Sequence, residues 1–169
     1  GKLGKICMAE ARLNYYRDQA YYNSAGWRGT WELDGGGALM NQGVHGIDLI
    51  LWMLGDEIDT LYGKAETLAR KIPVEDTAAA LIRMKSGALC VIEGATTAYP
   101  GFSSTFTIYG EKGTVSFDDQ HIIAWDFIDQ ENAPARPDLG DEVVGGAKNP
   151  IDIGIYGHIC LLRDIAQAV

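Results

Sequence analysis

The sequence predicts an α+β fold in a single domain: an open, predominantly antiparallel β-sheet with helices packed on one face. Three observations predict it. After residue 55 the apolar residues change from a spacing of three or four to alternation, which is typical of strands. The turns between these strands are short, at 86–87 and 111–113, as in β-hairpins. Helical spacing is confined to two segments, so an antiparallel sheet covered by a few helices is expected.

The elements follow in a simple order. A first helix is predicted at 37–54, with an apolar stripe and a C-capping glycine at Gly55. A second helix is predicted at 155–168, after a polar loop at 130–150. Both helices are expected to cover one face of the sheet, and a second copy of the chain is expected to cover the other. The predicted strands are 4–13, 60–70, 76–85, 88–99, 103–110, 114–119 and 121–127. The apolar stripes are Met40, Val44, Ile47, Leu51 and Leu54 in the first helix and Ile155, Ile159, Leu162 and Ile165 in the second.

Composition narrows the classes of partner. The net charge is −9 and the pI about 4.7, which disfavours a nucleic acid or an anionic membrane surface as partner. No run approaches the roughly 18 apolar residues of a membrane helix. Cys7, Cys90 and Cys160 are an odd number of separated thiols, so we expect them to be buried and reduced in a cytoplasmic protein. The chain does not begin with Met, and we expect it to be a fragment.

Residues 14–34 form a long segment without regular spacing, rich in Tyr, Trp and Arg. Disordered segments are poor in aromatic residues, so a functional loop is expected. The aromatic side chains together with Arg17 and Arg28 indicate a binding surface. The alternative is a loop that only packs over the edge of the sheet.

The predicted helix at 37–54 carries the best candidate for chemistry. Asn41, His45, Asp48 and Trp52 have spacings that place them on one stripe, apart from the apolar stripe. His45 is suited to proton transfer near neutral pH, with Asp48 holding the ring and Asn41 donating to a substrate oxygen. The alternative is a core histidine beside a tight turn.

The glycines at 35–37 raise the question of a nucleotide site. They lack the third spaced glycine of a dinucleotide-binding fingerprint, and neither a Walker loop nor HExxH occurs. We expect these glycines to allow close backbone approach. His121 is expected to be solvated, His158 to be structural, and Glu75-Asp76 to be a turn pair rather than an acid/base site. No spacing of Cys or His indicates a metal.

Four stretches in order resemble the C-terminal domain of the Gfo/Idh/MocA family of NAD(P)-dependent oxidoreductases. They are residues 15–55, with "GGGALMNQGVHGID" at their centre, 74–101 ("VEDTAAALIRMKSGALCVIEGATTAYPG"), 107–119 ("TIYGEKGTVSFDD") and 157–169 ("GHICLLRDIAQAV"). The resemblance implies a substrate-binding and oligomerisation domain. In such proteins an N-terminal Rossmann domain binds the cofactor and carries a lysine in a Glu-Lys-Pro motif. That domain is missing from this chain, so NAD or NADP would be bound mainly outside it.

The resemblance also assigns roles to residues. His45 matches the histidine that transfers a proton at the substrate hydroxyl. Asn41 stands where many members have an aspartate, and Asp48 matches a supporting acidic position. Arg17, Tyr21, Trp27 and Arg28 lie in the loop that lines the substrate side, where the arginines would clamp a carboxylate or phosphate.

The implied function is hydride transfer to or from a secondary alcohol of a sugar, nucleotide sugar or cyclitol. The isolated chain is expected to be inactive and, in the whole protein, to form a dimer or tetramer through its open sheet face. Two alternatives stay open: an NAD-dependent glycosidase of the same family, or a non-catalytic binding or scaffold relative.

Overall fold

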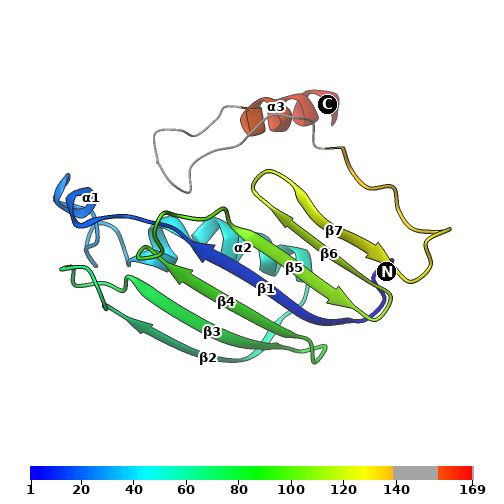
Figure 1. Cartoon of the computed structure of the whole chain (residues 1–169), viewed down its shortest axis with the longest axis horizontal. Coiled ribbons are helices and arrows are strands. Elements are labelled where there is room, and N and C mark those ends of the chain that lie inside the picture. Colours follow the sequence, from blue (N-terminus) through cyan, green and yellow to red (C-terminus); the bar gives the residue numbers. More distant parts are fainter. Residues whose placement is uncertain (139–155, 169) are drawn as a thin grey trace.

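The computed structural model describes residues 1–138 and 156–168. Its centre is a seven-stranded sheet in the order β2-β3-β4-β1-β5-β6-β7 (Figure 1). β1 runs parallel to β4, and all other neighbouring strands are antiparallel. The predicted fold class is therefore confirmed. The strands are β1 (Ile6–Asn14), β2 (Ile58–Glu66), β3 (Thr77–Met84), β4 (Leu89–Ala95), β5 (Thr105–Gly110), β6 (Gly113–Asp118) and β7 (Ile122–Phe127).

Both predicted hairpins form at their glycines. Gly87, between β3 and β4, has a φ of +91°, a left-handed conformation that glycine adopts without steric cost. Between β5 and β6, Gly110 pairs with Gly113, and the two residues between them make the turn. β2 ends at Glu66 rather than at residue 70, because the N–H groups of residues 68–70 donate to the Asp76 carboxylate instead of to a strand.

The core lies between the sheet and α2 (Val44–Leu54), which packs on β1. From β1, Ala9, Ala11 and Leu13 point into it and are fully buried. A Cβ atom on Gly46 of α2 would lie only 2.4 Å from Leu13 Cδ2, so this glycine sets how closely the helix approaches the sheet. The remaining fully or almost fully buried members of the core are Ile50, Ile82, Met84, Ala88, Cys90, Ile92, Phe106 and Ile108.

The helix predicted at 37–54 is divided in two. Residues Ala38–Gln42 form a π-helical turn, η1, and α2 begins after Gly43. The wider π turn puts the preceding residues out of phase with the α-helix. The predicted buried stripe is therefore wrong at its start, where Met40 and Val44 are exposed, and the helix buries Gly46 and Ile50 instead. The C-cap is confirmed: Gly55 has a φ of +57° and its N–H donates to Leu51 O.

The last helix, α3 (Tyr156–Ala168), forms where predicted but does not cover the sheet. Figure 1 shows it apart from the strands, and Leu162 and Ile165 are exposed. Amphipathic spacing therefore predicted the helix but not its packing, since Leu162 and Ile165 of the predicted apolar stripe are exposed. The predicted loop at 130–150 lies outside the described residues from 139 onward, as does Ile155.

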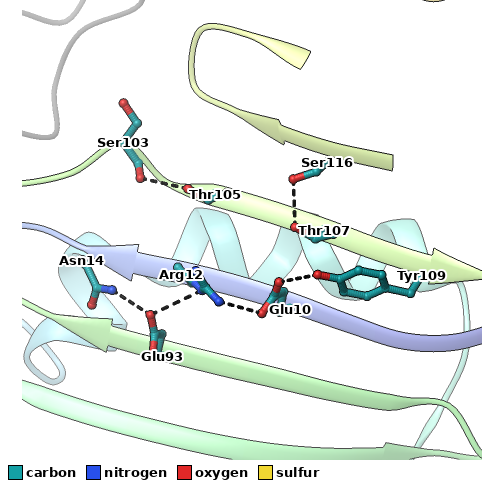
Figure 2. Close-up of polar contacts among 9 residues, drawn as sticks. All are labelled: Glu10, Arg12, Asn14, Glu93, Ser103, Thr105, Thr107, Tyr109 and Ser116. Atoms are coloured by element: carbon teal, nitrogen blue, oxygen red, sulfur yellow. Dashed lines mark hydrogen bonds and ion pairs between the residues drawn. The ribbon is translucent and has the colours of Figure 1, made fainter. Parts of the chain in front are cut away.

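None of the described helices covers the face of the sheet opposite α2, and this face carries a chain of polar contacts across β4, β1 and β5 (Figure 2). Asn14 Nδ2 donates to Glu93 Oε1 at 2.8 Å, and Tyr109 donates to Glu10 Oε1 at 2.9 Å. Arg12 lies between the two carboxylates, 3.2 Å from Glu10 and 3.8 Å from Glu93. The centre of this face therefore holds charges that partly neutralise one another.

Two further expectations concern thiols and membranes. Cys90 is buried as expected, but Cys7 is exposed, and it lies where the register between β1 and β5 shifts, between Ile6 and Met8. The side chain of Cys160 lies outside the described part of the chain. None of the helices that the structure describes is long and apolar enough to cross a membrane.

Candidate active site

The glycine run before α2 packs against the start of β3. Gly37 N–H donates to Glu75 Oε2 at 2.9 Å, Leu39 N–H to Glu75 Oε1 at 3.0 Å, and Ala38 N–H to the Glu75 carbonyl at 2.9 Å. A Cβ atom on Gly37 would lie 1.7 Å from that carbonyl oxygen, so only glycine fits. The close approach expected of the glycines is thus to the protein's own backbone, and Glu75 caps η1.

η1 joins this capped segment to the aromatic loop through Gln42. The Gln42 side chain accepts from Arg17 Nη2 at 3.0 Å and donates to the Tyr21 hydroxyl at 3.1 Å. It also donates to Asn41 Oδ1 at 2.5 Å. Single π turns are frequent at functional sites, where they redirect side chains. Gln42 was not predicted from the sequence, and its position beside Asn41 is the only signal that points to it.

Asn41 lies on η1 rather than on α2, so it does not continue the predicted stripe of His45, Asp48 and Trp52. Its amide donates to Asp34 Oδ1 at 2.5 Å, and Asp34 Oδ2 accepts from Gly29 N–H at 2.7 Å. Asn41 therefore fixes the end of the aromatic loop against the start of the helix. Sequence spacing missed Asp34 as a partner, because the contact depends on how the loop folds back onto η1.

His45 lies in the first turn of α2 with an exposed side chain, so it is not a core histidine. Asp48 and Trp52 follow on the same outward face, and Trp52 is 76% exposed. Within residues 1–138 and 156–168, neither the His45 nor the Asp48 side chain makes a hydrogen bond or ion pair. The described residues thus show no contact between Asp48 and the imidazole, and the supporting role of Asp48 stays a prediction.

The aromatic loop is more ordered than the sequence predicted. It contains a five-residue helix, α1 (Gln19–Asn23), whose N-cap Asp18 accepts from Tyr21 N–H at 2.8 Å. Tyr22 is buried and donates to Thr96 Oγ1 at 2.8 Å. Burial raises the pKa of Tyr22, which remains a neutral donor. This anchor explains why residues 14–34 hold one conformation.

The two arginines of the loop differ in environment. Arg17 is only 5% exposed and donates to Tyr16 O at 2.7 Å as well as to Gln42. Arg28 is half-buried, with its guanidinium carbon 4.2 Å from the ring centre of Tyr21 and 4.5 Å from that of Trp27. The structure therefore joins Arg17, Tyr21, Trp27 and Arg28 in one cluster, which Gln42 connects to η1.

The described residues contain no Rossmann unit around the glycine run. The glycine run is filled by Glu75, so its N–H groups are not free to cradle a pyrophosphate. The sheet has one parallel strand pair, and η1 and α2 do not follow a strand as in a Rossmann unit. No group of three or more His, Cys, Asp or Glu with metal-binding geometry occurs in the part of the chain that the structure describes.

Solved structures with this fold include several dehydrogenases. The WlbA dehydrogenase from Bordetella pertussis, in complex with NADH and UDP-GlcNAcA, is 38% identical with a TM-score of 0.71. The match covers 82% of this chain and 39% of that protein. A levoglucosan dehydrogenase in complex with NADH and L-sorbose has the same fold, with a TM-score of 0.67 at 22% identity over 78% of this chain and 38% of the other.

Among curated proteins, myo-inositol 2-dehydrogenase of Thermotoga maritima is 29% identical over 87 residues, which are 49% of this chain and 26% of the relative. The chain thus spans well under half the length of the relatives it matches. The family model of the GFO/IDH/MocA C-terminal domain matches residues 1–116. Since that match covers more than half of the chain, the protein belongs to the Gfo/Idh/MocA family and corresponds to its C-terminal domain.

Proposed function

We propose that this chain is the substrate-binding part of an NAD(P)-dependent dehydrogenase that acts on a secondary alcohol of a sugar, nucleotide sugar or cyclitol. The observation that carries the proposal is the exposed imidazole of His45, one helical turn after a π turn that is bonded to an arginine–aromatic cluster. The relatives act on polyols or sugars or are solved with NADH and a nucleotide sugar, which supports the same reaction class.

In this proposal His45 exchanges the proton of the reacting hydroxyl. An exposed neutral imidazole takes a proton when the alcohol is oxidised and returns it when the ketone is reduced. Asn41 stabilises the loop through Asp34 and is not a base, since an amide does not titrate. Asp48, one turn further along α2, supports His45 electrostatically.

The cofactor supplies the hydride acceptor or donor when bound. We propose that residues outside those described hold it, since the glycine run is occupied by Glu75. This chain contributes the surface that binds and orients the substrate. Arg17, Tyr21, Trp27 and Arg28 form that surface, with Arg17 supporting the cluster from its buried position.

The test is His45→Ala in the whole enzyme that contains this domain. We expect kcat to fall by about 10²- to 10⁴-fold, the usual contribution of a general acid–base group, with substrate binding little changed. Oxidation is followed by NADH absorbance with a panel of polyols and nucleotide sugars.

His121→Ala is the matched control. His121 is an exposed histidine that directly precedes β7, an edge strand of the sheet, and its Nδ1 atom lies 3.6 Å from Asp118 Oδ1. Its turnover should equal that of the wild type. Full activity of the His45 variant would exclude the proposed role. Release of free sugar without net NADH would indicate the glycosidase instead, and a wild type without turnover on the whole panel would indicate a scaffold.

We also propose that two copies of the chain associate through the uncovered face of the sheet. Apolar side chains gather on the part of this face where β1 begins and the β3–β4 hairpin turns. Met8 pairs across the strands with Leu89, and Leu81 lies on the neighbouring strand; all three are 38–46% exposed. Exposed apolar patches of this kind mark association surfaces.

A further inference from the structure

Arg28 is a restrained cation whose hydrogen-bonding groups are unused. Its guanidinium lies within 4.5 Å of the ring centres of both Tyr21 and Trp27, close enough for cation–π attraction to each. Its Nε atom is buried and has no hydrogen-bond partner. Over the described part of the chain, the Arg28 side chain makes no hydrogen bond and no ion pair, although a guanidinium has five N–H donors.

Buried N–H donors are nearly always satisfied, so an unsatisfied one calls for a partner. Contacts with two rings restrain the guanidinium, whose N–H groups have no hydrogen-bond partner among the described residues. Carboxylate and phosphate groups match the edge of a guanidinium with two parallel hydrogen bonds. A guanidinium that is already held in place loses less side-chain entropy on binding than a mobile one, and this favours affinity.

The local charge also favours an anion. Arg17 lies 5.4 Å from the same Tyr21 ring, so two guanidinium groups share one aromatic side chain. The chain as a whole has a net charge of −9, so the attraction for an anion has to come from local positive charge such as these two guanidinium groups. One carboxylate of the loop, Asp34, already accepts from Gly29 N–H and Asn41.

We propose that Arg28 is the binding residue for an anionic group of the substrate, either a sugar carboxylate or a phosphate. This inference rests on the proposed function and narrows it to anionic sugar derivatives. The Tyr21 hydroxyl is bonded to Gln42, three residues before His45, which puts the anion site next to the start of α2. A substrate held at Arg28 by its anionic group would then present another part of its ring to His45.

The test is a titration of the 169-residue chain with four probes, followed in proton–nitrogen correlation spectra. Glucuronate carries a carboxylate alone, UDP-GlcNAc carries phosphates alone, UDP-GlcNAcA carries both, and glucose is neutral. The signals to watch are the Arg28 Nε–H and the Trp27 indole N–H. The Trp27 signal is identified among the four tryptophans by its loss in Trp27→Phe.

We expect the anionic probes to shift both signals and glucose to shift neither. Arg28→Gln should weaken binding by about 10-fold or more, the usual loss for a charge-assisted hydrogen bond. Arg28→Lys keeps the charge but loses the fork, so its affinity should be intermediate. Arg83→Gln is the matched control, because Arg83 lies on β3 in an ion pair with Asp59, away from the cluster.

Comparison of the three anionic probes distinguishes a carboxylate from a phosphate as the group that Arg28 binds. Arg28-dependent binding of glucuronate identifies a carboxylate, and Arg28-dependent binding of only the UDP compounds identifies a phosphate. Equal affinity of the wild type and Arg28→Gln for every probe, or no shift with any anion, overturns the inference. Because no cofactor or turnover is involved, this result is independent of the His45 test of the proposed reaction.

Discussion

Asp76 shows how a single buried carboxylate shapes the region beside the candidate site. It is fully buried and accepts the N–H groups of Leu68, Ala69 and Arg70 at 3.0, 2.8 and 2.7 Å. The Thr77 hydroxyl also donates to it, at 3.0 Å. Burial alone raises the pKa of Asp76, but these donors together outweigh burial and lower it below the ordinary value of 3.8. The sequence predicted Glu75 and Asp76 as a turn pair. The Glu75 carboxylate caps η1, and the Asp76 carboxylate holds the turn at residues 68–70.

Asp76→Asn should therefore destabilise the fold by about 1.5–3 kcal/mol at neutral pH, because an amide accepts fewer and weaker hydrogen bonds than a carboxylate. The sign of the pH dependence follows from the lowered pKa. The contribution of Asp76 is fully present above pH 3.8 and is lost as the pH falls through its lower folded-state value. Urea unfolding at several pH values, from neutral to acidic, measures both effects.

Asp119→Asn is the control for that measurement. Asp119 also accepts a backbone N–H, from Ser104 at 2.8 Å, but burial is the largest influence and raises its pKa. Its charged form is therefore disfavoured in the folded state, and an asparagine keeps the acceptor without the charge. We expect this variant to be as stable as the wild type at neutral pH, or slightly more stable. Equal losses in both variants would contradict the account of Asp76.

At the scale of elements, strands and hairpins were predictable because alternation and turn glycines are local signals. The division of 37–54 into η1 and α2 was not, since a π turn is fixed by distant groups: Glu75 caps it and Gln42 ties it to Arg17 and Tyr21. The same applies to α1, a short helix that depends on the Asp18 cap and on the burial of Tyr22. The sequence thus predicted His45 as a candidate but not the contacts of η1 that precede it.

Gly37→Ala tests whether the contact between η1 and Glu75 sets the position of the site. The added Cβ would lie 1.7 Å from the Glu75 carbonyl, a backbone atom that cannot rotate away. We expect a loss of about 1–3 kcal/mol or more, as for overpacking, with amide exchange speeding up over residues 37–43. The matched control is Gly26→Ala, because nothing lies within 4 Å of its Cβ position. Unchanged stability in Gly37→Ala would mean that the segment is free to move.

At the scale of the whole molecule, the sheet has two unlike faces. One is buried by α2. The other combines the Glu10–Arg12–Glu93 cluster (Figure 2) with the apolar patch of Met8, Leu81 and Leu89. The alternation of apolar residues along the strands predicts that the sheet has two different faces, but it does not predict what packs on the second face. The other helix that was predicted to pack on the sheet, α3, lies apart from it (Figure 1). The proposed partner for this face is a second copy of the same face, since its charges partly neutralise one another within each chain.

Leu89→Arg tests this association. Leu89 is 41% exposed and lies opposite Met8, at the centre of the apolar patch. A buried leucine contributes about 1.5–3 kcal/mol, so the arginine should weaken self-association by roughly 10-fold or more and shift the chain toward monomer. Light scattering at micromolar concentrations measures the shift. Leu162→Arg is the control, because Leu162 is 65% exposed on α3, apart from the sheet, and should leave the mass unchanged. A wild type that is already monomeric under these conditions would exclude the proposed interface, since the patch would then remain exposed without a function in assembly.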